Sequence, residues 1–109
     1  MKIYGQTDEV IVREMVEDDC GKFLELMTEH GTNEDFTVED IRVLWEFRKE
    51  KGDLQCTITS ADGVAVCGFC GIREVKKGRS EIRISFFEQY ADNRYEQSIR
   101  HIFRDFFDK

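Results

Sequence analysis

Apolar and polar residues alternate in the segment EVIVREM near the start of the chain. Val10 and Val12 fall on one face of an extended chain, whereas Ile11 and Arg13 fall on the other. A period of two residues is typical of a strand that buries one face, so this segment predicts a first β-strand over residues 9–15.

Two segments after this strand carry apolar residues at helical spacing. Asp18 or Asp19 offers an N-cap for the first helix, which ends at Gly31. Its apolar face consists of Phe23, Leu26, Met27 and His30, and we interpret His30 as a half-buried packing residue. Thr37 and Asp40 form a capping-box-like start for the second helix, which ends before Gly52. Its stripe consists of Val38, Ile41, Leu44, Trp45 and Arg48, which places Trp45 in the core.

A β-hairpin is predicted next, because the segment LQCTITS alternates again and is followed by Asp62-Gly63, a strong turn signal. If this turn closes a two-residue loop, Ala61 pairs with Val64 and Cys56 lies opposite Phe69. The second strand, VAVCGFCGI, is apolar on both faces, which is typical of a central strand that is covered on both sides. Gly68 and Gly71 in this strand indicate a bulge or a close backbone approach.

The last two elements are a strand and an amphipathic helix. In the strand EIRISFF, Ile82, Ile84 and Phe86 face one way, and Glu81, Arg83, Ser85 and Phe87 face the other. The helix has its apolar stripe at Tyr95, Ile99, Ile102, Phe103 and Phe106. The predicted order is therefore β-α-α-β-β-β-α, an α+β fold with a mostly antiparallel sheet and packed helices.

Length and composition favour a single domain over residues 1–109, since 40% of the residues are hydrophobic and can form a core. The first residues do not resemble a signal peptide and no apolar segment approaches membrane-spanning length, so a cytoplasmic location away from membranes is expected. The net charge of −7 argues against direct nucleic-acid binding. Residues 1–50 hold 14 acidic against six basic residues, either as a solvated surface or as a face for a basic partner.

The four cysteines permit three interpretations. Cys67 and Cys70 form a C-x-x-C pair, but they lie within an apolar strand, where residues three apart point to opposite faces. No second pair of cysteines or histidines completes a metal site. We therefore predict structural buried thiols and no metal, with a metal site and a redox pair as the less favoured alternatives.

The order of these elements, together with three motifs, resembles the GNAT superfamily of acetyl-CoA-dependent N-acetyltransferases. VIVREMVEDDCGKFLELM is similar to the family's first strand and helix, and TSADGVAVCGFCGI is similar to its second hairpin. SEIRISFFEQYADNRYEQSIRHIFRDFFD resembles the fourth strand and third helix of the ribosomal-protein-acetyltransferase branch. The resemblance covers nearly the whole chain and implies a truncated GNAT-like domain that lacks the later strands and helix.

The resemblance also implies roles for particular residues. The pantetheine arm of acetyl-CoA would pair with the strand backbone at Phe86, Phe87 and Glu88. The diphosphate would rest on the turn over residues 91–96, which includes Asn93, Arg94 and Tyr95. A carboxylate early in the same strand often acts as general base, and Glu81 matches that position.

The chain departs from this family pattern at the phosphate-binding turn, because Arg94 and Glu96 stand where glycines would be expected. Glycine lets a phosphate reach backbone N–H groups without meeting a Cβ atom, and the acidic neighbours would repel a phosphate. The phosphate-binding turn is therefore predicted to be degenerate, so that no cofactor is expected, with acetyl-CoA as the alternative.

The leading functional hypothesis is a non-catalytic protein that acts by binding another protein, as a regulator or inhibitor would. An anti-CRISPR or another mobile-element inhibitor is one form of this hypothesis, based on size and charge alone. The alternative is an active N-acetyltransferase that is completed by dimerisation. A homodimer through the C-terminal strand and helix is expected, because truncation would leave an unpaired edge and partly exposed apolar side chains. Those side chains are Ile84, Phe86, Phe87, Phe103 and Phe107.

Overall fold

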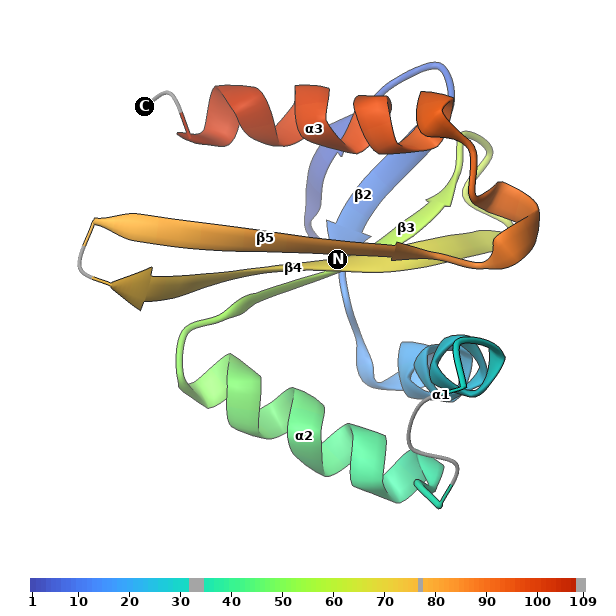
Figure 1. Ribbon diagram of the computed structural model, residues 1–109, viewed down its shortest axis with the longest axis vertical. Coiled ribbons are helices and arrows are strands. Elements are labelled where there is room, and N and C mark those ends of the chain that lie inside the picture. Colours follow the sequence, from blue (N-terminus) through green and yellow to red (C-terminus); the bar gives the residue numbers. More distant parts are fainter. Residues whose placement is uncertain (32–34, 77, 108–109) are drawn as a thin grey trace.

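The computed structural model describes residues 1–31, 35–76 and 78–107, in which a five-stranded antiparallel sheet packs against three helices (Figure 1). The strands are β1 (Ile3–Gln6), β2 (Val10–Glu14), β3 (Leu54–Ser60), β4 (Val66–Lys76) and β5 (Arg79–Phe86). The helices are α1 (Cys20–Glu29), α2 (Val38–Glu50) and α3 (Asn93–Phe107). Two 3-10 turns, η1 (Glu17–Asp19) and η2 (Glu88–Tyr90), precede α1 and α3. This arrangement confirms the predicted α+β fold.

The strands lie in the sheet in their chain order, from β1 at one edge to β5 at the other. Helices α1 and α2 cover one face of the sheet and α3 covers the other (Figure 1). Each face has its own core, because strand residues alternate between the two sides. The core under α3 contains Val10, Val12, Cys56, Ile58, Cys67, Cys70, Ile72, Ile99 and Phe103. The core under α1 and α2 contains Met15, Cys20, Leu26, Ile41 and Phe69.

Strand β1 was not among the predicted elements. It pairs antiparallel with β2, opposite the side on which β2 pairs with β3. Its sequence, IYGQ, is short and carries a glycine, which weakens any strand signal. A Cβ atom on Gly5 would lie 2.4 Å from a methyl carbon of Ile102, so the glycine lets α3 pack closely over this strand.

The turn between β3 and β4 is longer than the conditional two-residue loop, and the predicted register holds only for the pairs next to this turn. Ser60 donates its N–H to the carbonyl of Ala65 (2.8 Å), so the loop spans residues 61–64. Cys56 pairs with Cys70, not with Phe69, and the register shifts by one residue beyond Ile58. The extra residue at Cys67 is a β-bulge, which confirms that this glycine-containing strand is irregular.

The bulge also corrects the prediction for the C-x-x-C pair. Cys67 and Cys70 do not face opposite sides of the sheet; both pack in the core under α3. The inserted residue resets the alternation of side chains, so that residues three apart return to the same face. Gly68 lies in the same bulge, and a Cβ atom there would lie 2.2 Å from the Ser85 carbonyl oxygen. Glycine therefore lets β4 approach β5 closely.

A buried ion pair fixes the start of α1. The Arg13 guanidinium donates to the Asp19 carboxylate (2.7 and 2.9 Å), and Thr57 donates its hydroxyl to the same carboxylate (2.9 Å). Asp19 also accepts the Val16 N–H (2.9 Å). Burial by itself would raise the pKa of Asp19, but these hydrogen bonds outweigh burial and lower the pKa from its ordinary value of 3.8. Asp19 thus joins β2, η1 and β3 instead of capping α1 with its side chain.

Helix α2 begins as predicted, because Thr37 and Asp40 form a reciprocal capping box. Trp45 is half-buried against the core under α1 and α2, as expected. The outer face of α2 carries exposed apolar side chains instead: Val38 is 48% exposed and Phe47 56%. Val38 therefore does not belong to the buried stripe.

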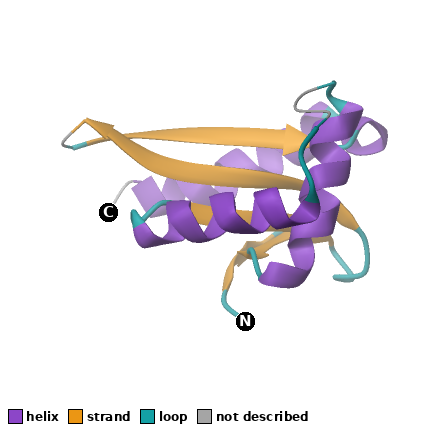
Figure 2. Cartoon of the chain, turned by 90° about the horizontal axis from the view of Figure 1, so that it is seen from below, coloured by secondary structure: helices purple, strands orange, loops and turns teal. Residues whose placement is uncertain are grey.

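The hairpin of β4 and β5 is the longest part of the sheet and extends past the ends of the helices (Figures 1 and 2). Within the described residues, the far end of the hairpin is therefore sheet without a helix on either face.

No helix within the described ranges is both long and apolar enough to cross a lipid bilayer.

Candidate functional site

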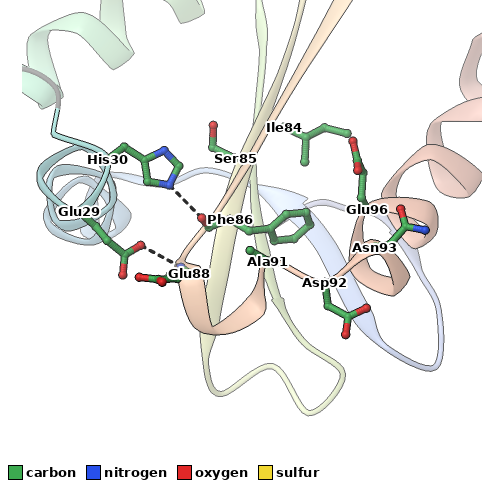
Figure 3. Close-up of a pocket in the computed structure, with 10 residues that line it drawn as sticks. All are labelled: Glu29, His30, Ile84, Ser85, Phe86, Glu88, Ala91, Asp92, Asn93 and Glu96. Carbon is green, nitrogen blue, oxygen red and sulfur yellow. Dashed lines mark hydrogen bonds between the residues drawn. The ribbon is translucent and has the colours of Figure 1, made fainter.

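A cavity of about 740 Å³ lies where the end of α1, the end of β5 and the start of α3 meet (Figure 3). Glu29 and His30 reach it from α1 and the turn that follows. The remaining lining residues come from β5 to α3: Ile84, Ser85, Phe86, Glu88, Ala91, Asp92, Asn93 and Glu96. We call this space the acidic cavity, because four of the ten lining residues are carboxylic acids.

The end of α1 is hydrogen-bonded to the backbone at the end of β5 and to that of Glu88, which follows this strand (Figure 3). His30 Nε2 lies 3.0 Å from the Phe86 carbonyl oxygen, which places a ring N–H donor on that oxygen. The Glu29 carboxylate accepts the Glu88 N–H at 2.9 Å. The prediction that His30 is a half-buried packing residue is wrong: its side chain is exposed and holds β5 against α1.

The N–H groups at the start of α3 are also engaged by the chain itself. Asp92 is the residue before the helix, and its carboxylate accepts the Arg94 N–H at 2.8 Å, which is an N-cap interaction. The Asp92 carbonyl accepts the N–H groups of Tyr95 (3.0 Å) and Glu96 (3.4 Å). A carboxylate at a helix N-terminus takes the place where an external anion would otherwise be favoured.

Arg94 does not reach into the cavity to offer a cation to a ligand. Its guanidinium lies 3.7 Å from the Glu9 carboxylate and 4.0 Å from that of Asp92. It also lies over the ring of Tyr95, 5.0 Å from the ring centre. These three neighbours hold the side chain at the surface of α3, where it is 58% exposed.

The cofactor-binding residues predicted from the resemblance separate into two groups. Phe86, Glu88 and Asn93 line the acidic cavity together. Phe87 packs against the core under α1 and α2, and Tyr95 packs on the other side of the sheet, beside Phe86. Three of the six predicted residues therefore lie together at the cavity, and the other three do not line it.

Glu81, the predicted general base, lies elsewhere. It lines a second cavity of about 400 Å³, between the sheet and helices α1 and α2. Its carboxylate lies 3.6 Å from Arg73 and 3.5 Å from Arg83, and its side chain is 42% exposed. The carboxylate is thus paired with two arginines at the edge of the other cavity, away from the residues that would hold acetyl-CoA, and this position does not favour a role as general base.

The expected exposure of the C-terminal apolar side chains is only partly right. Ile84, Phe86 and Phe87 are partly exposed, as expected. Phe103 is 1% exposed, because α3 buries it against the sheet, and the side chain of Phe107 lies outside the described part of the chain.

The cysteines are buried, free thiols. Burial raises the pKa of Cys67 to about 11, and a hydrogen bond with Cys56, together with burial, raises the pKa of Cys70 well above its ordinary value. Across residues 1–31, 35–76 and 78–107, no group of three or more His, Cys, Asp or Glu side chains is arranged to hold a metal ion. Thiols in these surroundings are structural, because the reactive form of cysteine is the thiolate.

Comparison with solved structures identifies the architecture. The apo form of FdhC, a nucleotide-linked sugar GNAT, is similar with a TM-score of 0.72 and 10% identity over 94% of this chain. The spermidine N-acetyltransferase SpeG of Vibrio cholerae (N152L mutant) gives a TM-score of 0.69 and 10% identity over 89% of this chain. A proposed ribosomal-protein-serine acetyltransferase of Vibrio cholerae gives a TM-score of 0.69 and 11% identity over 97% of this chain. The chain has the GNAT fold.

The GNAT fold is present here without detectable likeness of sequence. No protein-family model matches the chain, and neither does any curated protein. The chain spans 65% of the FdhC structure, 64% of the SpeG structure and 71% of the third. The comparisons therefore show the fold alone, and the activity must be argued from the residues of the site.

Proposed function

We propose that this chain is a non-catalytic GNAT-fold protein that binds the basic segment of another protein in its acidic cavity. Such a protein would act as a regulator or inhibitor of a larger, basic partner. The observation that carries the proposal is that the chain's own side chains occupy the backbone groups that the family resemblance assigns to acetyl-CoA.

The first of these groups belong to the strand that would hold the pantetheine arm. Pairing with that arm requires a free carbonyl and a free N–H at the end of β5. The Phe86 carbonyl already accepts from His30, and the Glu88 N–H already donates to Glu29. A coenzyme would have to displace both side chains, and the gain from each new hydrogen bond would be offset by the loss of an existing one.

The second set of groups belongs to the turn that would hold the diphosphate. The N–H groups of Arg94, Tyr95 and Glu96 bond to Asp92, as described above. A phosphate charge held about 4 Å from one carboxylate would be repelled by about 4 kcal/mol at the effective dielectric constant of a protein surface. Glu88, Asp92 and Glu96 all line the same cavity. The residues present therefore do not fit an anionic coenzyme.

The same features favour a cationic ligand. Four carboxylates and one histidine line an open cavity, and residues 1–50, which include Glu29 of this cavity, carry a net charge of −8. A lysine or arginine side chain can form charge-assisted hydrogen bonds with such carboxylates. A peptide segment is preferred over a small cation, because the cavity adjoins the open edge of β5 and the exposed end of α1.

The competing function is an N-acetyltransferase completed by dimerisation, with Glu81 as base and Arg94 near the diphosphate. The observation that favours it is the likeness to solved acetyltransferases, one of which acts on spermidine. The positions of Glu81 and Arg94 do not favour it, because Glu81 lines the other cavity and Arg94 is paired with acids.

Isothermal titration calorimetry separates the two functions. We expect no heat from acetyl-CoA at millimolar concentration and measurable binding of a hexa-arginine peptide. The double variant Glu88→Gln/Glu96→Gln should weaken peptide binding by about tenfold, given up to about 1 kcal/mol for each ion pair. The control Asp18→Asn/Glu50→Gln makes the same charge change at exposed residues outside the cavity and should bind as the wild type does. Micromolar binding of acetyl-CoA with transfer of acetyl to an amine would refute the proposal.

A further inference from the structure

The outer edge of β5 carries backbone groups that point away from the sheet. Phe87 donates its N–H to the Cys67 carbonyl (2.9 Å), and these two residues continue the register of β4 and β5. In an antiparallel pair, hydrogen-bonded residues alternate along each strand. The even-numbered residues Ile82 and Ile84 therefore direct their N–H and C=O groups outward, as the contact of the Phe86 carbonyl with His30 confirms.

Beyond this edge, no further strand pairs with β5 among the described residues. The end of the strand nearest the hairpin turn lies past the ends of the helices (Figure 2), so no helix obstructs another strand that approaches there in the plane of the sheet. An edge of this kind is a template for pairing with another chain. The question is which strand fits it.

The side chains along the edge are complementary to a second copy of themselves. We infer that two copies of this chain pair antiparallel through β5, with Ile82 opposite Ile82 of the second copy. Glu81 then lies opposite Arg83 of the second copy, and Arg83 lies opposite its Glu81. Opposite charges in such cross-strand positions are stabilising, and like charges are destabilising.

The neighbouring registers are less suitable. The proposed dimer has a two-fold axis that passes between the two copies of Ile82. If this axis lay at residue 83, Arg83 would face Arg83 of the second copy. If it lay at residue 81, Glu81 would face Glu81 of the second copy. An axis that lies between two consecutive residues would place even-numbered residues opposite odd-numbered ones. The N–H and C=O groups of the odd-numbered residues point toward β4, so the hydrogen bonds between the two copies would be lost. Compared with these adjacent registers, the register centred on Ile82 is the one in which both the charges and the outward hydrogen-bonding groups are matched.

This pairing would join two five-stranded sheets into one continuous sheet. It also brings the second copy to the acidic cavity, because Arg79 of that copy falls opposite Ser85, which lines the cavity. The dimer does not depend on the proposed function, since it is argued from the backbone and charges of residues 81–83 and not from the carboxylates of the cavity. Its failure would be seen in the mass of the particle, whereas failure of the proposed function would be seen in calorimetry.

Sedimentation velocity over a range of concentrations tests the dimer. We expect the wild type to dimerise, Arg83→Glu and Glu81→Arg each to weaken the dimer by about tenfold or more, and the swap Glu81→Arg/Arg83→Glu to restore it to within about threefold. Both side chains are exposed, at 42% and 72%, so circular dichroism should show a folded protein in each case. A wild type that remains monomeric at 0.5 mM (about the highest practical concentration), or a swap as weak as the single variants, would overturn the inference.

Oxidative cross-linking tests the register independently. Ile82→Cys should form a disulfide-linked dimer, because hydrogen-bonded cross-strand residues have Cα atoms about 5.5 Å apart. Ser80→Cys is the matched control, since residue 80 would lie about 14 Å from its own counterpart, four residues along the strand. The four native thiols are buried and do not compete. Equal cross-linking of both variants, or cross-linking of Ser80→Cys alone, would show that the register is wrong.

Discussion

Asp19 should be the most costly single charge to remove from this protein. The Asp19→Asn variant keeps the size of the side chain but leaves the Arg13 guanidinium, whose side chain is 17% exposed, without a carboxylate. Removing one partner of a buried ion pair typically costs about 3–5 kcal/mol. The lower end of that range applies, because the asparagine oxygen can still accept one of the hydrogen bonds.

Urea denaturation followed by circular dichroism measures this loss. With a slope of about 1.5 kcal/mol per molar urea, a loss of about 3 kcal/mol lowers the midpoint by about 2 M. The matched control is Asp18→Asn, an adjacent and exposed acid, which should change the free energy of unfolding by no more than about 0.5 kcal/mol.

The pH dependence provides a second check on the same carboxylate. The folded-state pKa of Asp19 is lower than its ordinary value of 3.8, so its contribution to stability is complete above that value and is lost as the pH falls through the folded-state pKa. The stability gap between wild type and Asp19→Asn should therefore be constant above about pH 5 and should narrow in more acidic solution. A loss below about 1 kcal/mol, or a gap that does not narrow, would refute the assigned role.

Two further predictions concern β4. Gly68→Ala should destabilise the protein by about 1–3 kcal/mol in urea denaturation, because its Cβ would collide with the Ser85 carbonyl. The control is Gly21→Ala in α1, which should stabilise the helix by up to about 1 kcal/mol because nothing lies within 4 Å of its Cβ. Equal effects of the two substitutions would contradict the close approach of β4 and β5. The thiols of Cys67 and Cys70 should react with Ellman's reagent at pH 8 only after unfolding in guanidinium, because burial keeps them in the thiol form; rapid reaction of the native protein would show that they are accessible.

Residue periodicity was enough to predict most of the fold, because each helix buries one apolar face against the sheet and most strand residues alternate between its two faces. Strand β1 could not be predicted in this way. Its glycine is explained only by the contact with Ile102, which lies almost a hundred residues further along the chain. The hairpin register was missed for a similar reason: a single extra residue at Cys67 shifts by one position every pair beyond the bulge, from Ile58–Gly68 to Leu54–Ile72.

The candidate site shows the same limit. The strand and turn that form one wall were predicted from the family resemblance, but the contribution of α1 was not. His30 and Glu29 lie 56 and 59 residues before their hydrogen-bond partners, and no local pattern encodes such a contact. Asp92 is different, because an aspartate just before a helix is a readable N-cap signal.

The chain order of the strands has a consequence for how the molecule opens. Every neighbouring pair of strands is joined by a short connection except β2 and β3, which are separated in sequence by both α1 and α2. Closing that long connection costs more chain entropy than closing any of the hairpins. The β2–β3 ladder is thus the expected boundary between two cooperative folding units, and partial unfolding should begin by separating β2 from β3. Thr57 of β3 and Arg13 of β2 both donate hydrogen bonds to the Asp19 carboxylate, which therefore links the two strands across this boundary.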